Sequence, residues 1–573
     1  MKTWYLFFLT VVLLLNQHVV WAKAKAQNVE VAYQIIVNGK PISDGPTIKL
    51  ICSPVASKSW TERTSKKMIP GTSTEASYID YTAQKTWQVA GFDDGSHLNT
   101  ATNFSEYPKL EQTGETTVIL GYNCQHVKTS LRSNSIDIWY TTDLSAKGTP
   151  SMGYGIPDGL VLRIVRNGNY EIVATKLDKK DIRQGDKIFP DDLGETVDLP
   201  LYRYLITEKL ITTVNIFTDE QISFGNEFKN PVSEESGTVF KYSHGTVILK
   251  KVKLPAITEG TQIYAELYQF SNGDAYDRTG SVFVIPEGKE RSFLDGLKNG
   301  VDSLPGFSSA NGKTYRGVIT SPDFDPLVEL FRFFTPFGIG KFNEQVKVYG
   351  QTWEDSTYYK QEVTELSPLL QGERWIGVFI GNYDKGGHKV SLRLKYYPGS
   401  MEMDDKTLKK MWVQPVFNTL NIMEMSGQEY GTMFEDDSLR VDFIVPDGVR
   451  NIKLRYITTG HGGWDGGDEY NQKPNTVLID NEVQFRYTPW RCDCATYRKY
   501  NPASGNFWNG ITSSDGSRSG WCPGTITNPV FYELPNLAPG MHTLKVAIPI
   551  GKREGNSFSS WNVSGILIGE YKD

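Results

Sequence analysis

Alternating polarity recurs along almost the whole chain, and it limits the possible fold more than any other feature. In the segments VSLRLKYY (390–397) and HTLKVAIPI (542–550) every second residue is a large apolar one. A β-strand with one buried face has this period of two. Residues 160–177, LVLRIVRNGNYEIVATKL, contain two such runs joined by Asn167-Gly168, a pair that suits the positive φ angles of a tight hairpin turn.

Helical periodicity is scarce by comparison. One short stretch, DDKTLKKMW from Asp404, has a helical pattern, whereas 53 Gly and 28 Pro residues interrupt the chain at short intervals. The sequence therefore predicts an all-β protein built of sandwiches or barrels.

The length of 573 residues corresponds to about three to four domains. Residues 27–211 contain their own strands, and we expect them to form a first domain. A second β-rich unit is expected at 212–398 and a third at 401–573. Between these two lies the segment YYPGSMEMDD, a break rich in Pro, Gly and acidic residues.

The first residues have the pattern of a secretory signal peptide. Lys2 precedes an apolar run over residues 4–15, and small residues follow near Ala22. We expect residues 1–22 to be removed, with cleavage between 22 and 26, and the mature protein to be periplasmic or secreted. No other apolar run approaches the roughly 20 residues that a membrane-spanning helix requires.

Export makes the five cysteines candidates for disulfides. Cys52 and Cys124 are expected to pair within the first domain. One of Cys492 and Cys494 is expected to pair with Cys522, which leaves one cysteine over. A zinc site at Cys-Asp-Cys is disfavoured because ligand pairs are usually two to four residues apart and four ligands are needed. No metal and no cofactor is expected.

Composition excludes some functions and leaves others open. The net charge of −6 gives no basic surface for nucleic acid. The sequence has no phosphate-binding glycine loop, no His-Glu-x-x-His and no Gly-x-Ser-x-Gly. Aromatic residues make up 12% of the chain, which suits carbohydrate contact but is also ordinary for an all-β protein.

Three polar clusters could carry chemistry. SNGDAYDRTG (271–280) holds two acids and an arginine around a tyrosine between two strands, although its Asn-Gly-Asp is also ordinary turn chemistry. TTGHGGWDGGDEY (458–470) places acids and a histidine on a segment too glycine-rich to pack a core. SRSGWCPG (517–524) would let a disulfide fix an arginine and a tryptophan, or would simply be a stapled surface loop.

These three clusters, together with RFFTP (332–336) and TTVNIFTDEQISFGN (212–226), resemble the bacterial peptide:N-glycosidase F family and occur in its order. The resemblance covers roughly 212–568. It implies two adjacent eight-stranded jelly-roll sandwiches with an active site between them. Residues 27–211 resemble the extra bowl-like N-terminal domain that some members carry.

The resemblance also implies an activity. The family hydrolyses the amide that joins an asparagine side chain to the first N-acetylglucosamine of an N-glycan, leaving aspartate and releasing a glycosylamine. N-glycoproteins and N-glycopeptides would be the substrates, and a monomer is expected. Asp277 matches the principal catalytic acid and Glu469 a second one. The substrate-binding residues implied by the resemblance are Tyr276, Arg278, His461, Arg518, Trp521 and Tyr383.

Two further expectations follow from the resemblance. The partner of Cys522 should be Cys494, leaving Cys492 unpaired. Another family glutamate falls on Gly381, in VFIGNY, so this chain lacks that carboxylate. The missing acid keeps two other functions open, which are a glycoside hydrolase acting on the N-glycan core and a non-catalytic glycan-binding sandwich.

Overall fold

The computed structural model shows a mostly β protein that separates into two compact units, residues 1–209 and 210–573. Each unit is described by itself. The predicted signal peptide and residues 404–409 of the helical pattern lie outside the described residues. The last two residues of that pattern, Met411 and Trp412, begin strand β25 (Met411–Asn418), so the helix prediction is wrong there. No helix in the described part is long and apolar enough to cross a membrane. The described residues are 28–42, 45–62, 69, 71–180, 188–225, 228–310, 312–347, 349–350, 352–399, 410–462, 466–504, 512–550 and 557–572.

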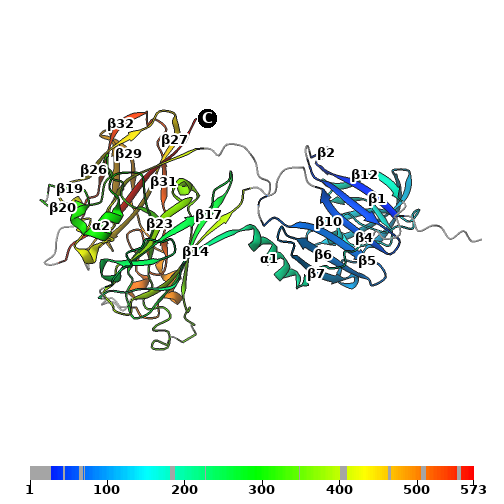
Figure 1. The fold of residues 1–573 in the computed structure, drawn as a ribbon, viewed down its shortest axis with the longest axis horizontal. Helices are drawn as coiled ribbons and strands as arrows, with labels where there is room; N and C mark the ends of the chain where they lie inside the picture. The colour runs from blue at the N-terminus through cyan, green and yellow to red at the C-terminus, as the bar shows by residue number, and fades with distance from the viewer. Residues whose placement is uncertain are drawn as a thin grey trace, which may run out of the picture. The chain divides into compact units, whose positions relative to one another are not determined.

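The first unit is built on one large curved sheet (Figure 1). Its strand order is β13-β7-β6-β5-β4-β3-β1-β12-β11-β10-β9-β8, with β2 paired to β1. The strands are β1 (Asn28–Val37), β2 (Lys40–Pro41), β3 (Thr47–Cys52), β4 (Ala56–Glu62), β5 (Thr74–Asp80), β6 (Lys85–Gly91), β7 (His97–Asn103), β8 (Glu111–Ile119), β9 (Tyr122–Leu131), β10 (Asn134–Thr141), β11 (Leu160–Arg166), β12 (Tyr170–Lys180) and β13 (Glu195–Thr196).

The predicted hairpin is confirmed in this sheet. β11 and β12 pair antiparallel, and Asn167 (φ 51°) and Gly168 (φ 69°) both have the positive φ values that the turn needs. At the other end of the sheet, helix α1 (Leu199–Leu210) packs through the fully buried Tyr202 against Ala90 and Leu98.

The expected disulfide between Cys52 and Cys124 is wrong. The two thiols are free and buried, and they lie on β3 and β9, which four other strands separate in the sheet. Each contacts a nearby carbonyl, Cys52 that of Val29 and Cys124 that of Tyr122. Burial in this apolar core raises the pKa of Cys52 to about 12 and that of Cys124 to about 11.

The second unit contains two β-sandwiches, as predicted (Figure 1). Within the described residues, the first pairs β14-β24-β17-β22 with β15-β16-β23-β18-β21, and the four-residue β15 adds a short edge to eight longer strands. Its strands are β14 (Thr212–Ile222), β15 (Val239–Tyr242), β16 (Val247–Leu254), β17 (Gln262–Ser271), β18 (Thr279–Ile285), β21 (Val328–Phe334), β22 (Thr357–Glu362), β23 (Gly372–Ile380) and β24 (His388–Tyr397).

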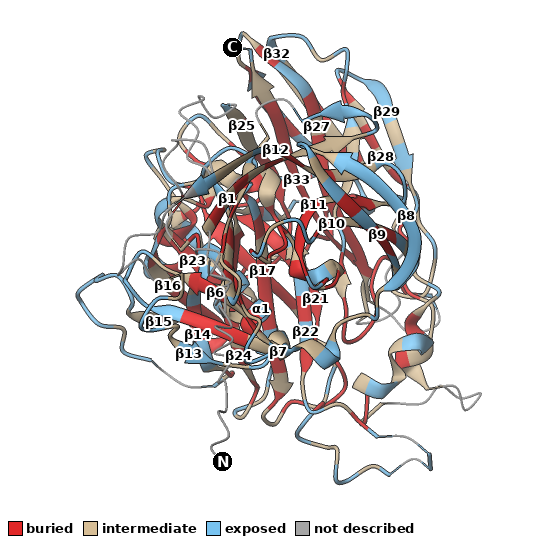
Figure 2. Ribbon diagram, turned by 90° about the vertical axis from the view of Figure 1, so that its right-hand side faces the viewer, coloured by how far each residue is buried: buried red, intermediate tan, exposed pale blue. Residues whose placement is uncertain are grey.

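The second sandwich has eight strands among the described residues, in the sheets β25-β33-β27-β31 and β26-β32-β28-β29. Figure 2 shows long buried stretches along the strands of both sandwiches. The strands are β25 (Met411–Asn418), β26 (Leu439–Val445), β27 (Val449–His461), β28 (Asn475–Ile479), β29 (Glu482–Tyr487), β31 (Val530–Glu533), β32 (Gly540–Ala547) and β33 (Ser560–Tyr571). Helix α2 (Phe293–Asn299) and the hairpin β19 (Gly306–Ser308) and β20 (Thr314–Arg316) lie in the connection between β18 and β21.

Buried arginines join the two sandwiches. Arg332 on β21 pairs with Glu329 at 2.5 Å and donates across the interface to Thr459 Oγ1 at 3.0 Å and to the Asn562 carbonyl at 2.6 Å. Arg455 on β27 of the second sandwich donates to the Leu330 carbonyl of the first sandwich at 2.8 Å. Charged groups taken out of water in this manner are stable only when every partner is present.

We predict that Arg332→Ala destabilises the second unit strongly. The substitution leaves the fully buried Glu329 carboxylate without its cation, which typically costs about 3–5 kcal/mol. The measurement is the thermal unfolding midpoint of the purified protein. Lys347→Ala, which removes an exposed pair with Glu344, serves as the control and should leave the midpoint unchanged. Equal midpoints for the two variants would contradict the prediction.

Candidate active site

The acid-rich loop between β17 and β18 is held by its own side chains. Asp274 is buried and accepts from Arg278 Nε at 2.7 Å and from the Tyr276 backbone amide at 3.0 Å. Thr335, just beyond β21, accepts from the Arg278 amide at 2.7 Å and donates to the Tyr276 carbonyl at 2.9 Å. These contacts fix the backbone on either side of Asp277, so the loop is more than a solvated turn.

Asp274 and Asp277 experience opposite electrostatic environments. Burial alone would raise the pKa of Asp274, but His388 and Arg278 outweigh it and hold that pKa at about 2. For Asp277, burial outweighs the effect of Arg518, and the nearby Glu469 charge adds to it. The pKa of Asp277 is therefore raised from 3.8 to about 7.

Arg518 brings the two sandwiches together at one point. Its Nη1 lies 3.0 Å from Asp277 Oδ2 of the first sandwich and also pairs with Glu469 Oε1 of the second. Its side chain is 1% exposed, and its pKa is raised because the two carboxylates outweigh the effect of burial. The family resemblance implied one site for these three residues, and the structure brings them into contact.

The position of Arg518 is fixed from several sides. Its Nη2 donates to the Ser513 carbonyl at 2.7 Å, and its guanidinium lies 4.3 Å from the Trp521 ring centre and 5.2 Å from that of Tyr470. The predicted disulfide between Cys494 and Cys522 is confirmed and staples the same segment. Cys492 is free and exposed, also as predicted.

The glycine-rich segment that carries Glu469 follows the end of β27. Gly462 has φ +98°, and a Cβ atom at that position would lie 2.0 Å from the Phe558 carbonyl oxygen, so only glycine fits. The backbone carbonyl of Glu469 accepts a hydrogen bond from the Ser519 amide at 2.9 Å, which connects this segment to the one that carries Arg518. Trp464 lies outside the described residues.

The neighbouring acid, Asp468, has a structural position. It is fully buried, and its Oδ2 accepts from Trp561 Nε1 at 2.8 Å. The chain around it forms turns, and β28 begins only at Asn475, so turn geometry separates the two neighbouring acids.

His461 and Trp521 lie behind the site. Trp521 is 3% exposed, stacks on Phe334 with 4.1 Å between ring centres, and donates to the Gly460 carbonyl at 3.1 Å. His461 bonds Thr459 Oγ1 at 2.8 Å, and burial, Arg332 and Arg518 together lower its pKa to about 3. His461 is therefore neutral at physiological pH, and the burial of Trp521 leaves that ring no face for a sugar.

Exposed rings form the outer edge of the site. The Arg278 guanidinium lies 4.9 Å from the ring centre of Tyr276 and 5.1 Å from that of Tyr383. Both rings remain open to solvent, with exposed fractions of 59% and 55%. Of the predicted binding residues, these three can reach a ligand approaching from outside.

Glu424 is a further carboxylate at this edge that the sequence analysis missed. Its Oε1 accepts from the hydroxyls of Tyr383 and Tyr430. A Cβ atom on Gly381 would lie 3.3 Å from Glu424 Oε2, so Glu424 places its acid where a side chain from Gly381 would begin. Nothing in NIMEMSGQEY (421–430) separates this glutamate from ordinary surface acids, so only the folded arrangement identifies it.

Known family models and solved structures match both units of the chain. Family models match at residues 213–396 (Peptide-N-glycosidase F, N terminal), 429–568 (Peptide-N-glycosidase F, C terminal) and 31–203 (N-glycanase peptide, N-terminal domain). Two solved structures of PNGF-II, in space groups C2 and P21, are each 43% identical over 96% of this chain. They are covered over 99% and 100% of their own length, with TM-scores of 0.80 and 0.84. No curated protein matches the chain. The chain belongs to the peptide-N-glycosidase F family and carries that family's additional N-terminal domain.

Proposed function

We propose that the second unit hydrolyses the amide between an asparagine side chain and the first N-acetylglucosamine of an N-glycan. The observation that carries this proposal is the meeting of Asp277 and Glu469, one from each sandwich, on the single buried cation Arg518. Water adds to the amide carbon, the C–N bond breaks, and a proton passes to the departing nitrogen. The products are a peptide aspartate and a glycosylamine, which then loses ammonia.

Asp277 suits the proton transfers of this reaction. A carboxyl group whose pKa is about 7 is present in both protonation states near neutral pH, so it can accept a proton from water and return it to the leaving nitrogen. Glu469, held by Arg518, would orient the attacking water. Arg518 itself compensates negative charge that develops on the amide oxygen or the carboxylates.

Sugar binding is assigned to the exposed edge. Tyr276 and Tyr383 offer ring faces for the C–H surface of the first N-acetylglucosamine, and Arg278 between them offers donors. Glu424 would accept hydrogen bonds from sugar hydroxyls and so supply the carboxylate that is missing at Gly381. Trp521 and His461 would act through Arg518 and the packing behind it rather than by touching substrate.

The proposal includes export. The signal-peptide pattern of residues 1–22 motivates it, and the Cys494–Cys522 disulfide fits an oxidising compartment. A mature protein whose N-terminus begins after residue 22 to 26, read by mass spectrometry of the cell-free fraction, would agree. An intact Met1 on active protein would contradict it.

We predict that Asp277→Asn lowers turnover on a short N-glycopeptide by about a hundredfold or more, because it removes the group that moves the proton. Glu469→Gln should also be severe. Asp468→Asn is the matched control, since it keeps the acceptor for Trp561 Nε1. The readout is the mass of the peptide product. Asparagine converted to aspartate identifies the amidase, whereas a sugar left on asparagine identifies a glycoside hydrolase. Absence of turnover by the wild type would indicate a non-catalytic glycan-binding protein.

The raised pKa of Asp277 predicts a pH-dependent stability. The folded state disfavours the ionised carboxylate, so the stability that the protonated form provides is fully present below pH 3.8 and is lost as pH rises through about 7. Asp277→Asn should therefore unfold at a higher temperature than the wild type at pH 8, but not at pH 4. Asp323→Asn is the control, because its partners Ser321 and Arg291 lower its pKa, and it should give no gain at pH 8. A gain that is the same at both pH values would contradict the prediction.

We predict that Glu424→Gln lowers kcat/KM on glycopeptides by about tenfold, mainly through a higher KM, as expected for loss of one charge-assisted hydrogen bond to the sugar. Glu429→Gln, which removes a nearby glutamate paired with Lys313 at 2.7 Å, is the control and should be silent. Steady-state kinetics on one defined glycopeptide would test both variants. An unchanged KM for Glu424→Gln would remove this residue from the site.

A further inference from the structure

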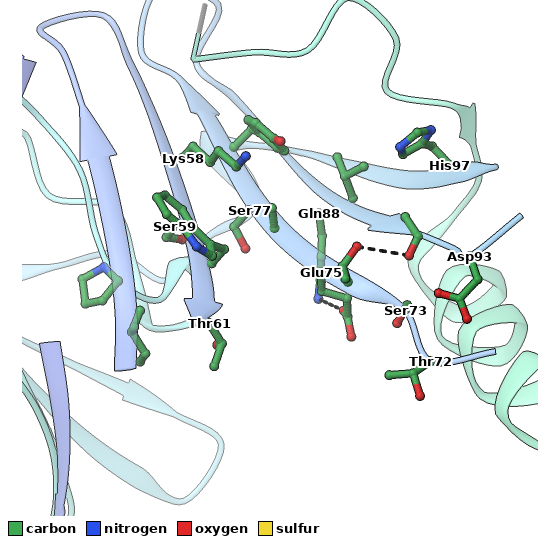
Figure 3. Close-up of a pocket in the computed structure, with 18 residues that line it drawn as sticks. Lys58, Ser59, Thr61, Thr72, Ser73, Glu75, Ser77, Gln88, Asp93 and His97 are labelled. Atoms are coloured by element: carbon green, nitrogen blue, oxygen red, sulfur yellow. Dashed lines mark hydrogen bonds between the residues drawn. The ribbon is translucent and has the colours of Figure 1, made fainter. Parts of the chain in front are cut away.

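The first unit contains a hollow that the proposed hydrolysis does not use. It encloses about 640 Å³, a size typical of pockets for small organic ligands. Figure 3 shows its labelled side chains on β4, β5, β6 and β7 and on the segments that connect them, with helix α1 beside them. Ser59, Ser77 and Gln88 contribute to its lining, together with Thr61 and Thr72.

The strand register explains why this part of the sheet is open. Leu50 pairs with Ser59, Ser59 with Ser77, and Ser77 with Gln88. Directly paired residues lie on the same face of a sheet. The face that carries the apolar core at Leu50 therefore continues onto β4, β5 and β6 as hydroxyls and an amide. Such a row stabilises no apolar core, but it offers hydrogen bonds to a ligand.

A carboxylate is held at one end of this row. Glu75 accepts from Gln88 Nε2 at 3.0 Å, a bond drawn in Figure 3, and from the hydroxyl of Tyr202 on helix α1 at 3.2 Å. Tyr202 is fully buried, so the helix sets the orientation of the Glu75 carboxylate. An oriented carboxylate can still accept further hydrogen bonds, because each oxygen has two lone pairs.

A second observation points to a missing partner. Thr72 lines the hollow and is 4% exposed, and its hydroxyl has no hydrogen-bond partner among the described residues. A buried hydroxyl left unpaired is costly, and a donor or acceptor brought by a ligand would remove that cost. The nearby Ser73 is also buried.

The lining selects the chemistry of the ligand. The carboxylates of Glu75 and Asp93 disfavour phosphate, sulfate and other anions. The ammonium group of Lys58 is engaged with the rings of Trp60 and Tyr78, whose centres lie 5.3 and 5.6 Å away. Hydroxyl and amide side chains that both donate and accept, next to one fixed carboxylate, match the vicinal hydroxyls of a neutral sugar.

We propose that this hollow binds a neutral oligosaccharide, namely the mannose-containing part of an N-glycan. The choice of glycan rests on the proposed function of the second unit, whereas the existence of the binding site does not. The first unit would then hold a glycoprotein by its carbohydrate during repeated cleavage.

The test uses the full chain and a free oligomannose glycan that carries a photoreactive diazirine. This probe has no asparagine, so it cannot be hydrolysed. After irradiation, peptide mapping locates the labelled segments. We expect labelling within 47–62 and 72–91 that excess unlabelled oligomannose removes. Ser77→Trp, which fills the hollow, and Glu75→Gln, which removes the carboxylate without adding bulk, should each reduce that labelling by about tenfold.

Thr117→Trp adds the same bulk on the exposed strand β8 and is the matched control. It should leave labelling unchanged, and all three variants should cleave a short glycopeptide at the wild-type rate. Absence of labelling in these segments, or labelling that survives both hollow variants, would overturn the proposal. Stronger labelling by a diazirine on an unglycosylated peptide would assign the hollow to polypeptide and also overturn it. If the wild-type protein does not cleave the glycopeptide, that result would instead count against the function proposed for the second unit.

Discussion

The charge of one buried arginine organises the candidate active site. Arg518 is almost completely withdrawn from water, and it pairs there with Glu469 and, at 3.0 Å, with Asp277. Each carboxylate belongs to a different sandwich, so the cation meets both partners only when both sandwiches are folded and docked. The disulfide at Cys522, the rings of Tyr470 and Trp521 and the Ser513 carbonyl hold the arginine in place. The same low-dielectric surroundings that make this cluster costly also raise the pKa of Asp277 toward neutrality.

The sequence was informative where local chemistry determines the structure. Period-two alternation predicted the strands, and Asn167-Gly168 predicted a hairpin whose φ angles are those observed. The resemblance placed Asp277, Glu469 and Arg518 in one site and selected Cys494 over Cys492. These features depend on residue types at fixed spacing along short segments, which is the information that a single sequence carries.

The sequence failed where distant strands decide the outcome. Cys52 and Cys124 were expected to pair because they are neighbours in the list of cysteines, but sheet order places four strands between theirs. Glu424 was missed because its place at the edge of the site depends on Tyr383 and Tyr430, and on the space beside Gly381. The burial of Trp521 depends on Phe334 of the other sandwich, a contact that no local pattern predicts.

One short strand has a consequence for how substrates enter. The two-residue strand β30 (Ile526–Thr527) follows the Arg518 segment and hydrogen-bonds to Phe333 and Arg332 on β21, so a sheet of the first sandwich continues into chain belonging to the second. Thr335, which anchors the Asp277 loop, lies just beyond the end of β21. A hinge motion that separated the two carboxylates would have to break this sheet and expose buried arginines. The two sandwiches therefore hold the separation of the two carboxylates fixed. Under the proposed function, adaptation to different glycans would fall to the exposed rings of Tyr276 and Tyr383, whose rotamers can change without moving the backbone.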